Sequence, residues 1–351
     1  MKKRIIGLDI LRVIGIIFIF CYHFTDSFIA YGGVGEGVFN ALTFFSIMSR
    51  PASQFLFIVS GFALMYNSED NLGLREYYYR RFKGLFIPFY VAYVLMLGIG
   101  VALLKWAPWR TIPKWKFVYT ILGIDGLASN FSPDFYLIGE WFMSCIVVCY
   151  LLFPLLAYCL KRFRYITLCA LVAVYVALVY ISNPFMISAY TNPLAILLYF
   201  YIGMLLQKEL EERLLSTWIK ISCLLLSMAI FVYFVTASIV TSKQLLVLSE
   251  SGSELLCFIW ALSMLITFKE VDIPAKSLSY RLIKYFSGIS WQFILVHHVL
   301  AIIYFTLNGV SQSLLKDCVI IFFISLILAE LVKHISVAIR ILLQWISKNH
   351  I

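Results

Sequence analysis

Long apolar runs recur along nearly the whole chain, and they constrain the fold more than any other feature. A membrane-spanning helix needs roughly 20 mostly apolar residues. Ten runs approach or reach that length: 5–25, 51–67, 84–104, 141–160, 165–182, 193–207, 219–240, 254–268, 285–307 and 318–333. The sequence therefore predicts an all-α polytopic membrane helix bundle with about ten transmembrane helices.

Composition excludes a soluble protein. Of the 351 residues, 62% are hydrophobic and 13% are charged, whereas soluble domains have about 45–50% apolar and about 25% charged residues. Charge at half the usual density cannot cover a water-facing surface, so much of the surface must face lipid.

The formal net charge of +10 could suggest a nucleic-acid partner, but the basic residues lie in short clusters between apolar runs. Such clusters mark the cytoplasmic side of membrane helices. With a cytoplasmic N-terminus, about 20 of the 28 Lys and Arg residues fall inside and about 7 outside. This asymmetry predicts that both termini are cytoplasmic and that nucleic acid is not a partner.

The connections predict a single transmembrane domain over residues 1–333. Only the segments 25–50 and 105–140 are long, and the second is expected to hold a re-entrant or surface helix around 115–123. Residues 334–351 place apolar side chains on one side, as in a cytoplasmic amphipathic helix on the membrane surface. All eight cysteines lie in apolar runs without a CxxC pair, which is typical of small buried side chains.

The first apolar run contains ionisable residues, which are costly in lipid unless they are paired or hydrated. Arg12 and His23 are eleven residues apart, so a helix places them within about 20° of one face and about 16 Å apart. Asp9 lies one turn before Arg12 and Asp26 one turn after His23. Two readings remain open: Asp9 and Arg12 pair with each other and His23 lies at the interface, or all line a functional groove.

A basic cluster precedes the third apolar run and contains Arg80, Arg81 and Lys83. Cations at this position can simply follow the positive-inside rule. Alternatively, they bind a polyanion such as a nucleotide, because arginine makes bidentate contacts to phosphate.

Two further polar elements interrupt apolar sequence. His297 and His298 lie deep in the ninth run, where an intramembrane histidine pair more often lines a polar cavity than faces lipid. Neighbouring helical residues point about 100° apart, so we predict no metal site. Glu140 and Trp141 begin the fourth run, where the carboxylate either favours the helix dipole or serves the chemistry.

Taken together, these motifs resemble acyltransferase family 3, whose integral membrane proteins O-acylate bacterial surface polysaccharides. The resemblance rests on five motifs in order along the chain: Leu8-Asp9-Ile10-Leu11-Arg12 with ten residues before His23, Phe57-Ile58-Val59-Ser60-Gly61-Phe62, Arg80-Arg81-Phe82-Lys83 to Pro88, Gly139-Glu140-Trp141-Phe142 to Pro154, and Phe293 to His297. Two positions depart from the family pattern, since Ile146 stands where many members have Glu, and Gly84 where a further Arg or Lys is frequent.

The resemblance implies acyl-coenzyme A, most often acetyl-CoA, as the donor, without a permanently bound cofactor. It implies a hydroxyl of a glycan or lipid-linked glycan as the acceptor, in the bacterial cytoplasmic membrane. Arg80, Arg81, Lys83 and Ser60 are then expected at the donor. Catalytic roles are expected for His23, Arg12, Asp26 and Glu140, with His23 as general base. Asp9, Trp141, His297 and His298 are expected to line the substrate cavity. The alternative function is a polysaccharide exporter or flippase.

Overall fold

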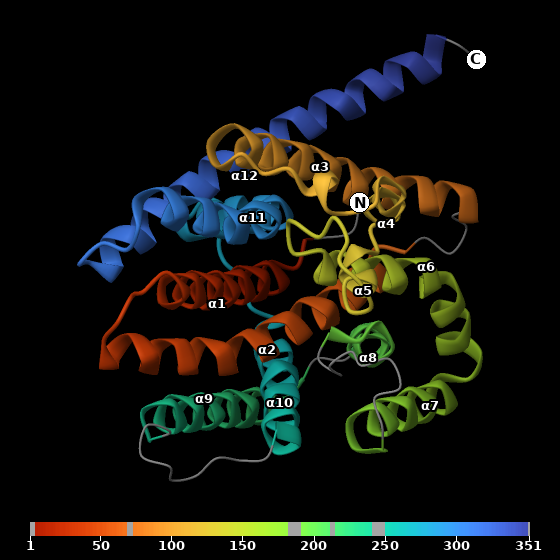
Figure 1. Cartoon of the computed structure of the whole chain (residues 1–351). Coiled ribbons are helices and arrows are strands. Elements are labelled where there is room, and N and C mark those ends of the chain that lie inside the picture. The colour runs from red at the N-terminus through yellow and green to blue at the C-terminus, as the bar shows by residue number, and fades with distance from the viewer. Residues whose placement is uncertain (1–3, 69–72, 182–190, 211–214, 241–249, 350–351) are drawn as a thin grey trace. The chain divides into compact units, whose positions relative to one another are not determined.

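The computed structural model describes residues 4–68, 73–181, 191–210, 215–240 and 250–349. Within these ranges every regular element is a helix, which confirms the all-α prediction (Figure 1). Eight helices are long and apolar enough to cross a membrane. They are α1 (Ile6–Ala30), α2 (Glu36–Tyr66), α3 (Leu74–Leu104), α6 (Glu140–Arg162), α8 (Pro193–Leu210), α9 (Thr217–Val240), α11 (Leu278–Asn308) and α12 (Leu314–Asn349).

Two other predicted spans are helical but shorter in their apolar part. Helix α7 (Arg164–Val176) continues into a π-helical turn, η3 (Ala177–Ile181), and α10 (Glu250–Phe268) is apolar from Leu255. Length and composition thus identify eight spanning helices in the described residues, and the number ten stays a prediction. The chain is a multi-pass membrane protein.

The predicted long connection over residues 25–50 is wrong. Helix α1 continues to Ala30 and α2 already begins at Glu36, which leaves only a short turn between them. The apolar run predicted over residues 51–67 therefore starts well inside α2. Proline is tolerated inside membrane helices, and Pro51 lies within α2.

A helix is present where the other long connection was expected to hold one, and its re-entrant or surface location stays a prediction. A 3₁₀ turn, η2 (Lys114–Lys116), leads into α4 (Phe117–Leu122), and the short helices η1 (Pro108–Arg110) and α5 (Asp125–Ala128) flank them. The third helix begins ten residues earlier than predicted, so the basic cluster lies within α3 rather than before it.

The described chain forms two compact units. Unit 1 contains residues 1–25, 34–70 and 152–288, and unit 2 contains residues 26–33, 71–151 and 289–351. In unit 1, α10 packs against α2 and α9, and α2 packs extensively against α8 (Figure 1).

Two glycines set the spacing of α2 and α8. A Cβ at Gly61 would lie 2.0 Å from the carbonyl oxygen of Phe200, and a Cβ at Gly203 would lie 2.0 Å from that of Ile58. Small residues allow the backbones of membrane helices to approach closely. Within the Ser60-Gly61-Phe62 segment, Gly61 is therefore the residue at which α2 packs closely against α8.

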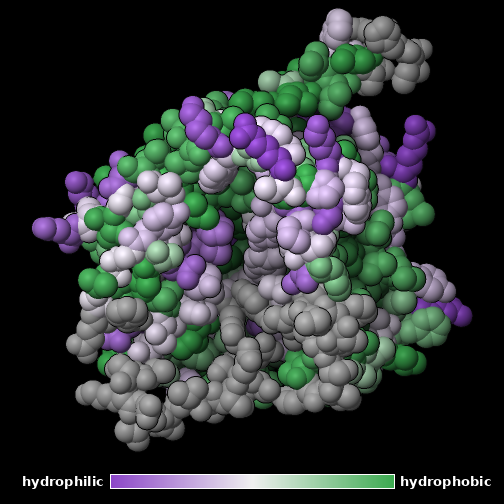
Figure 2. Space-filling model, viewed as in Figure 1, coloured by the Kyte–Doolittle hydropathy of each residue, from purple (hydrophilic) through white to green (hydrophobic). Residues whose placement is uncertain are grey.

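In unit 2, α12 packs against α3 and runs without a break through residue 333, the predicted end of the transmembrane domain. Its outward side carries exposed apolar side chains at helical spacing, and Figure 2 shows apolar surface along this helix. These side chains include Leu315, Val319, Phe323, Ile327 and Leu331. The surface location of the tail stays a prediction. Lys2, Lys3, Arg213, Lys243 and position 182 of the fifth predicted span lie outside the described residues.

We expect the connection between α2 and α3 to face the cytoplasm and the connection between α11 and α12 to face outside. Ser68→Cys should escape a membrane-impermeant thiol reagent added to intact cells, whereas Gln312→Cys, which is exposed, should react. The unmodified chain gives the background from native thiols such as the exposed Cys169. Strong labelling at position 68 would contradict the predicted orientation.

Candidate active site

In unit 1, a charged cluster forms around Asp9 near the start of α1. The carboxylate is 2% exposed. It accepts hydrogen bonds from Arg4 Nε at 2.5 Å, Arg12 Nη1 at 3.2 Å and Ser287 Oγ at 2.6 Å. The pairing of Asp9 with Arg12 anticipated from their spacing is therefore present. The contacts of Asp9 with Arg4 and Ser287 were not predicted. Three donors satisfy a buried charge that would otherwise be strongly destabilising.

His23 lies three turns further along the same uninterrupted helix. Its side chain is half-buried and its ring centroid is 5.0 Å from that of Tyr22. Because α1 has no break, Arg12 and His23 share a face about 16 Å apart, as helical geometry requires. Ser60, also in unit 1, is half-buried on α2 beside Gly61.

In unit 2, aromatic rings and one carboxylate hold the basic cluster of α3. Arg80 Nε donates to Glu76 Oε1 at 2.7 Å. The guanidinium of Arg81 lies 5.8 Å from the centre of the Tyr77 ring, and Lys83 Nζ lies 3.9 Å from the centre of the Tyr79 ring. Cation–π contacts of this kind position a cation without neutralising it.

Arg81 has a distinctive environment in this cluster. Its Nε is buried and has no hydrogen-bond acceptor among the described residues. A buried charged donor without an acceptor is unfavourable, and a phosphate oxygen would supply one.

The tyrosines of the same turn also tie α3 to α6. Tyr77 Oη donates to the carbonyl of Tyr150, and Tyr78 Oη to that of Leu151, both at 2.9 Å. Pro154 lacks an N–H group, so the carbonyl of Tyr150 has no intrahelical donor four residues ahead. The Tyr77 hydroxyl takes that place, and α3 and α6 are thereby joined beside the basic cluster.

Glu140, the first residue of α6, is fully buried. Its Oε1 accepts the backbone N–H groups of Leu137 and Ile138 at 2.7 and 2.9 Å, while Oε2 has no hydrogen-bond partner among the described residues. One oxygen therefore fixes the chain entering α6, and the other is available for a further hydrogen bond.

A short helix packs against this first turn of α6. A Cβ at Gly126 in α5 would lie 2.2 Å from the backbone of Trp141, so glycine permits the contact. The neighbouring Asp125 is fully buried and its Oδ1 accepts a hydrogen bond from Thr120 Oγ1 at 3.1 Å. Burial raises the pKa of Asp125 to about 7, against the opposing effect of the Thr120 hydrogen bond. Asp125 therefore titrates near neutral pH beside Glu140.

The histidine pair lies on α11 in unit 2. His297 is almost fully buried, its ring stacks on that of Phe293, and its Nδ1 is 3.0 Å from the Phe293 carbonyl. Since a carbonyl only accepts, Nδ1 carries the proton and Nε2 has the lone pair. His298 is half-buried and interacts electrostatically with Asp26.

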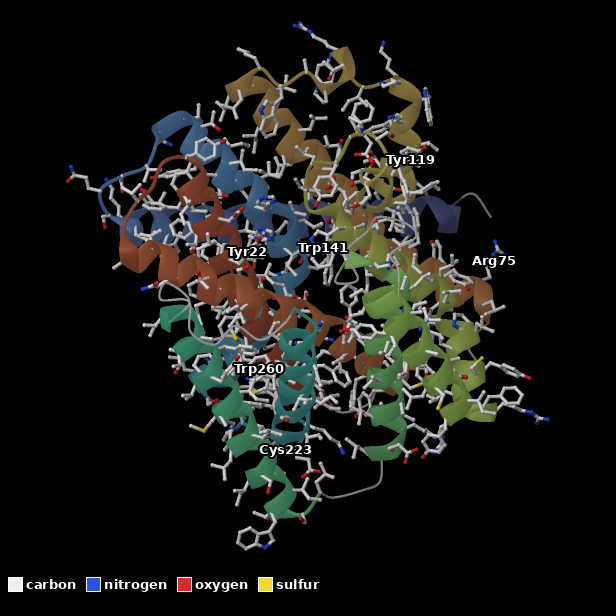
Figure 3. The ribbon with its side chains drawn as sticks, turned by 60° about the horizontal axis from the view of Figure 1, so that its bottom comes forward. Tyr22, Arg75, Tyr119, Trp141, Cys223 and Trp260 are labelled. Atoms are coloured by element: carbon white, nitrogen blue, oxygen red, sulfur yellow. The ribbon has the colours of Figure 1, made fainter. Side chains whose placement is uncertain are left out.

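Within each unit, the predicted site residues form the following groups. Asp9 and Arg12 are bonded in unit 1, which also holds His23 and Ser60. In unit 2, Glu140 and Trp141 lie beside the short helix that carries Asp125. Asp26 lies near His298. The basic cluster of α3 contacts the rings of Tyr77 and Tyr79. Figure 3 shows Arg75, at the start of α3, well separated from Trp141. Within the described ranges no group of three His, Cys, Asp or Glu side chains is placed to hold a metal ion.

Sequence reasoning missed Asp125 and the role of the tyrosines around the basic cluster. The Tyr77-Tyr78-Tyr79 run was a visible signal, because three hydroxyl-bearing rings next to three cations offer both cation–π contacts and hydrogen bonds. Asp125 gave no comparable signal, since an aspartate in a loop is ordinarily exposed.

One comparison with known proteins gives a match. The sequence model of a family described as an acyltransferase domain matches residues 5–333. No curated protein and no solved structure gives a significant match.

Proposed function

Because the chain belongs to acyltransferase family 3 and is a multi-pass membrane acyltransferase, we propose that it moves an acyl group from acyl-CoA to a hydroxyl of a cell-surface glycan or its precursor. We propose acetyl as the acyl group and the bacterial cytoplasmic membrane as the location. The exporter alternative is not favoured, since the matching family is one of acyltransferases.

The observation that carries the donor assignment is the basic cluster of α3. Coenzyme A is made in the cytosol and carries several phosphates, and the positive-inside count assigns this end of α3 to the cytoplasmic side. The buried Nε of Arg81 has no acceptor of its own among the described residues, which suits a phosphate ligand. Lys83, over the Tyr79 ring, adds a second positioned cation.

We assign the chemical step to His23. The acceptor hydroxyl oxygen attacks the thioester carbonyl carbon while His23 removes the hydroxyl proton. The new C–O ester bond forms, the C–S bond breaks, and the proton passes from His23 to the departing thiolate of coenzyme A. Arg12, about 16 Å from His23 along α1, binds negative charge on a phosphate of the donor. The neutral imidazole is suited to proton abstraction near neutral pH.

Replacement of Arg80 and Arg81 by Ala together should raise the apparent Michaelis constant for acetyl-CoA about tenfold or more while leaving that for the acceptor nearly unchanged. The physical reason is the loss of charge-assisted contacts to phosphate. The measurement is transfer of labelled acetyl groups in membranes at matched protein amounts. An acetyl-pantetheine donor, which lacks the nucleotide, should show a much smaller difference between the variant and the parent.

Lys161→Ala with Arg162→Ala is the matched control, since it removes two exposed cations at the end of α6, on the same predicted side of the membrane. It should leave both Michaelis constants near their parent values. Equal losses with acetyl-CoA and acetyl-pantetheine, or an equal loss in the control, would show that the α3 cluster only orients the helix.

A further inference from the structure

Two buried carboxyl side chains belong to neighbouring turns at the point where the chain enters α6, and the proposed function uses neither. Asp125 begins the short helix α5, and Glu140 begins α6. Gly126 brings the two elements into backbone contact, because a Cβ there would lie 2.5 Å from the carbonyl carbon of Glu140. Both side chains are 0% exposed, so neither carboxyl group is solvated by bulk water.

Each carboxyl group has hydrogen-bond donors on one oxygen only. Thr120 Oγ1 donates to Asp125 Oδ1 at 3.1 Å, whereas Oδ2 is buried and has no partner in the described ranges. Two backbone N–H groups donate to Glu140 Oε1, whereas its buried Oε2 has no partner there. Neither side chain forms an ion pair with a described residue. A buried carboxylate without a counter-ion is strongly unfavourable, and such a group takes up a proton instead.

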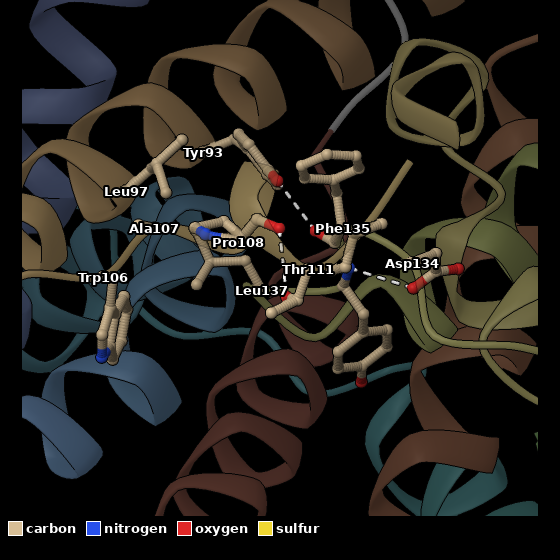
Figure 4. A pocket seen from close by; sticks show the side chains of 11 residues that line it. Tyr93, Leu97, Trp106, Ala107, Pro108, Thr111, Asp134, Phe135 and Leu137 are labelled. Atoms are coloured by element: carbon tan, nitrogen blue, oxygen red, sulfur yellow. Dashed lines mark hydrogen bonds between the residues drawn. The ribbon is translucent and has the colours of Figure 1, made fainter. Parts of the chain in front are cut away.

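Neighbouring titratable groups add negative rather than positive charge. Asp125 and Glu140 interact electrostatically with each other, and Asp134 of the same connection acts on Asp125. On the α3 side, Tyr93 interacts with all three carboxyl groups, but its hydroxyl donates to the carbonyl of Phe135 at 2.8 Å (Figure 4). Like charges in such proximity disfavour the ionised form of each.

The cation of this connection that acts on a carboxylate is Lys116, and it acts on Asp134. Its Nζ donates to Ser132 Oγ at 2.8 Å and to the carbonyl of Pro133 at 2.7 Å. Tyr136, the tyrosine that interacts with Glu140 and Asp134, brings no positive charge. The charge on the two buried carboxyl groups is therefore not balanced by these neighbours.

Solvent has access to the same connection. Tyr93 and Asp134 line a cavity of about 380 Å³ between α3 and the segment before α6 (Figure 4). This volume is large enough for several water molecules, which can carry a proton to and from the connection.

We infer that Asp125 and Glu140 form a carboxyl pair that retains a proton at neutral pH, and that this proton keeps α5 seated against the first turn of α6. With the proton present, the pair consists of one neutral carboxylic acid and one carboxylate. Without it, two negative charges lie in neighbouring turns, and α5 leaves α6. The proton comes from solvent and returns to solvent, so no other reactant is needed. This inference goes beyond the proposed function, which gives Asp125 no role.

The direct test is infrared spectroscopy of the full-length protein in nanodiscs, since the carbonyl stretch of a carboxylic acid is separate from the bands of a carboxylate. In the parent protein, a carboxylic acid band should disappear as the pH is raised through neutrality. Asp125→Asn and Glu140→Gln each leave a single carboxyl group, which should lose its proton at a lower pH than the parent pair does. Thr120→Val removes the hydroxyl that donates to Asp125 and should raise the midpoint by about 0.5–1 pH unit.

Asp317→Asn is the matched control. Asp317 is equally buried, but its two oxygens accept hydrogen bonds from Tyr304 Oη at 2.9 Å and from the N–H of Ser311 at 3.0 Å. Its replacement should leave the band and its midpoint unchanged. A band that is lost in Asp134→Asn and unchanged in both pair variants would assign the proton to Asp134 and overturn the inference.

Thermal unfolding in detergent measures the effect of the proton on the fold. Burial raises the pKa of Asp125 to about 7, from an ordinary value of about 3.9. The folded state therefore binds the proton more tightly, and this stabilisation is lost as the pH rises from about 4 through about 7. The unfolding midpoint of the parent should fall between about pH 5 and about pH 8. Asp125→Asn keeps a neutral side chain at every pH, so its midpoint should fall by at least about 2 °C less.

Three results would overturn the inference. They are the absence of a carboxylic acid band near neutral pH in the parent, band midpoints that stay unchanged in Asp125→Asn and Glu140→Gln, and a rise in the parent unfolding midpoint on adding Na⁺ or Ca²⁺ at alkaline pH that Asp125→Asn does not show. The last would mean that a metal cation takes the place given to the proton. None of these measurements uses an acyl donor, so their failure leaves acyl transfer intact, and a failure of acyl transfer leaves the carboxyl pair intact.

Discussion

His23→Ala should reduce acyl transfer by about 10²–10⁴-fold, the usual contribution of a general base, while donor binding and the amount of folded protein stay near parent values. The expected loss follows from the position of His23, half-buried on α1 and on the same face as Arg12. The assay is transfer from labelled acetyl-CoA in membranes, with protein amounts matched by blotting.

His334→Ala is the matched control, since this histidine also lies on a membrane helix but its side chain is 76% exposed. It should keep nearly full activity. Arg12→Lys should also be damaging, because an ammonium group cannot keep the Nη1 contact to Asp9 and also offer the further donors of a planar guanidinium. If His23→Ala keeps more than about a third of parent transfer, the base is elsewhere. His297, with its Nε2 lone pair, or Glu140, with its available Oε2, then becomes the leading candidate.

Gly203→Ala should destabilise the protein by about 1–3 kcal/mol or more, the range expected for overpacking a tight interface. The new methyl group would meet the carbonyl oxygen of Ile58 at 2.0 Å, and a backbone oxygen cannot move aside without displacing α2. Gly61→Ala should act in the same direction against Phe200. Thermal unfolding in detergent, followed by size-exclusion fluorescence, measures the effect.

Gly98→Ala provides the control, because a Cβ at this position in α3 meets nothing within 4 Å. Alanine is the better helix former, so this variant should match or slightly exceed the parent midpoint. A Gly203→Ala protein as stable as Gly98→Ala would show that α2 and α8 separate without loss, contrary to the close backbone packing described above.

Features that depend on nearby sequence were predictable. Hydropathy located the eight helices of the described residues that are long enough to span a membrane, and helical spacing anticipated the contact between Asp9 and Arg12. The family was predictable because its motifs are short local patterns that follow one another in order along the chain, and the family match over residues 5–333 confirms it. The start of α2 was misplaced, since apolar length alone marked only residues 51–67, whereas the helix begins at Glu36 and contains Pro51.

Features that depend on distant sequence were not predictable. Ser287 donates to Asp9 across 278 residues, and nothing near either residue marks the other. Asp134 and Tyr93 define one cavity only because α3 and the segment before α6 are brought together by folding. The sequence singled out Glu140. It did not predict that Oε1 would accept the N–H groups of Leu137 and Ile138 while Oε2 would have no partner among the described residues. That difference depends on how the chain enters α6, which residue spacing alone does not determine.

Pro154 has a consequence for the mechanics of α6. A missing backbone hydrogen bond makes a helix easier to bend at that point. Here the carbonyl of Tyr150, which loses that donor, accepts the hydroxyl of Tyr77 instead, and the neighbouring carbonyl of Leu151 accepts that of Tyr78; each hydroxyl lies 73 positions earlier in the chain. The backbone of α6 at this point is therefore restrained from outside the helix, by the same turn of α3 that carries Arg81.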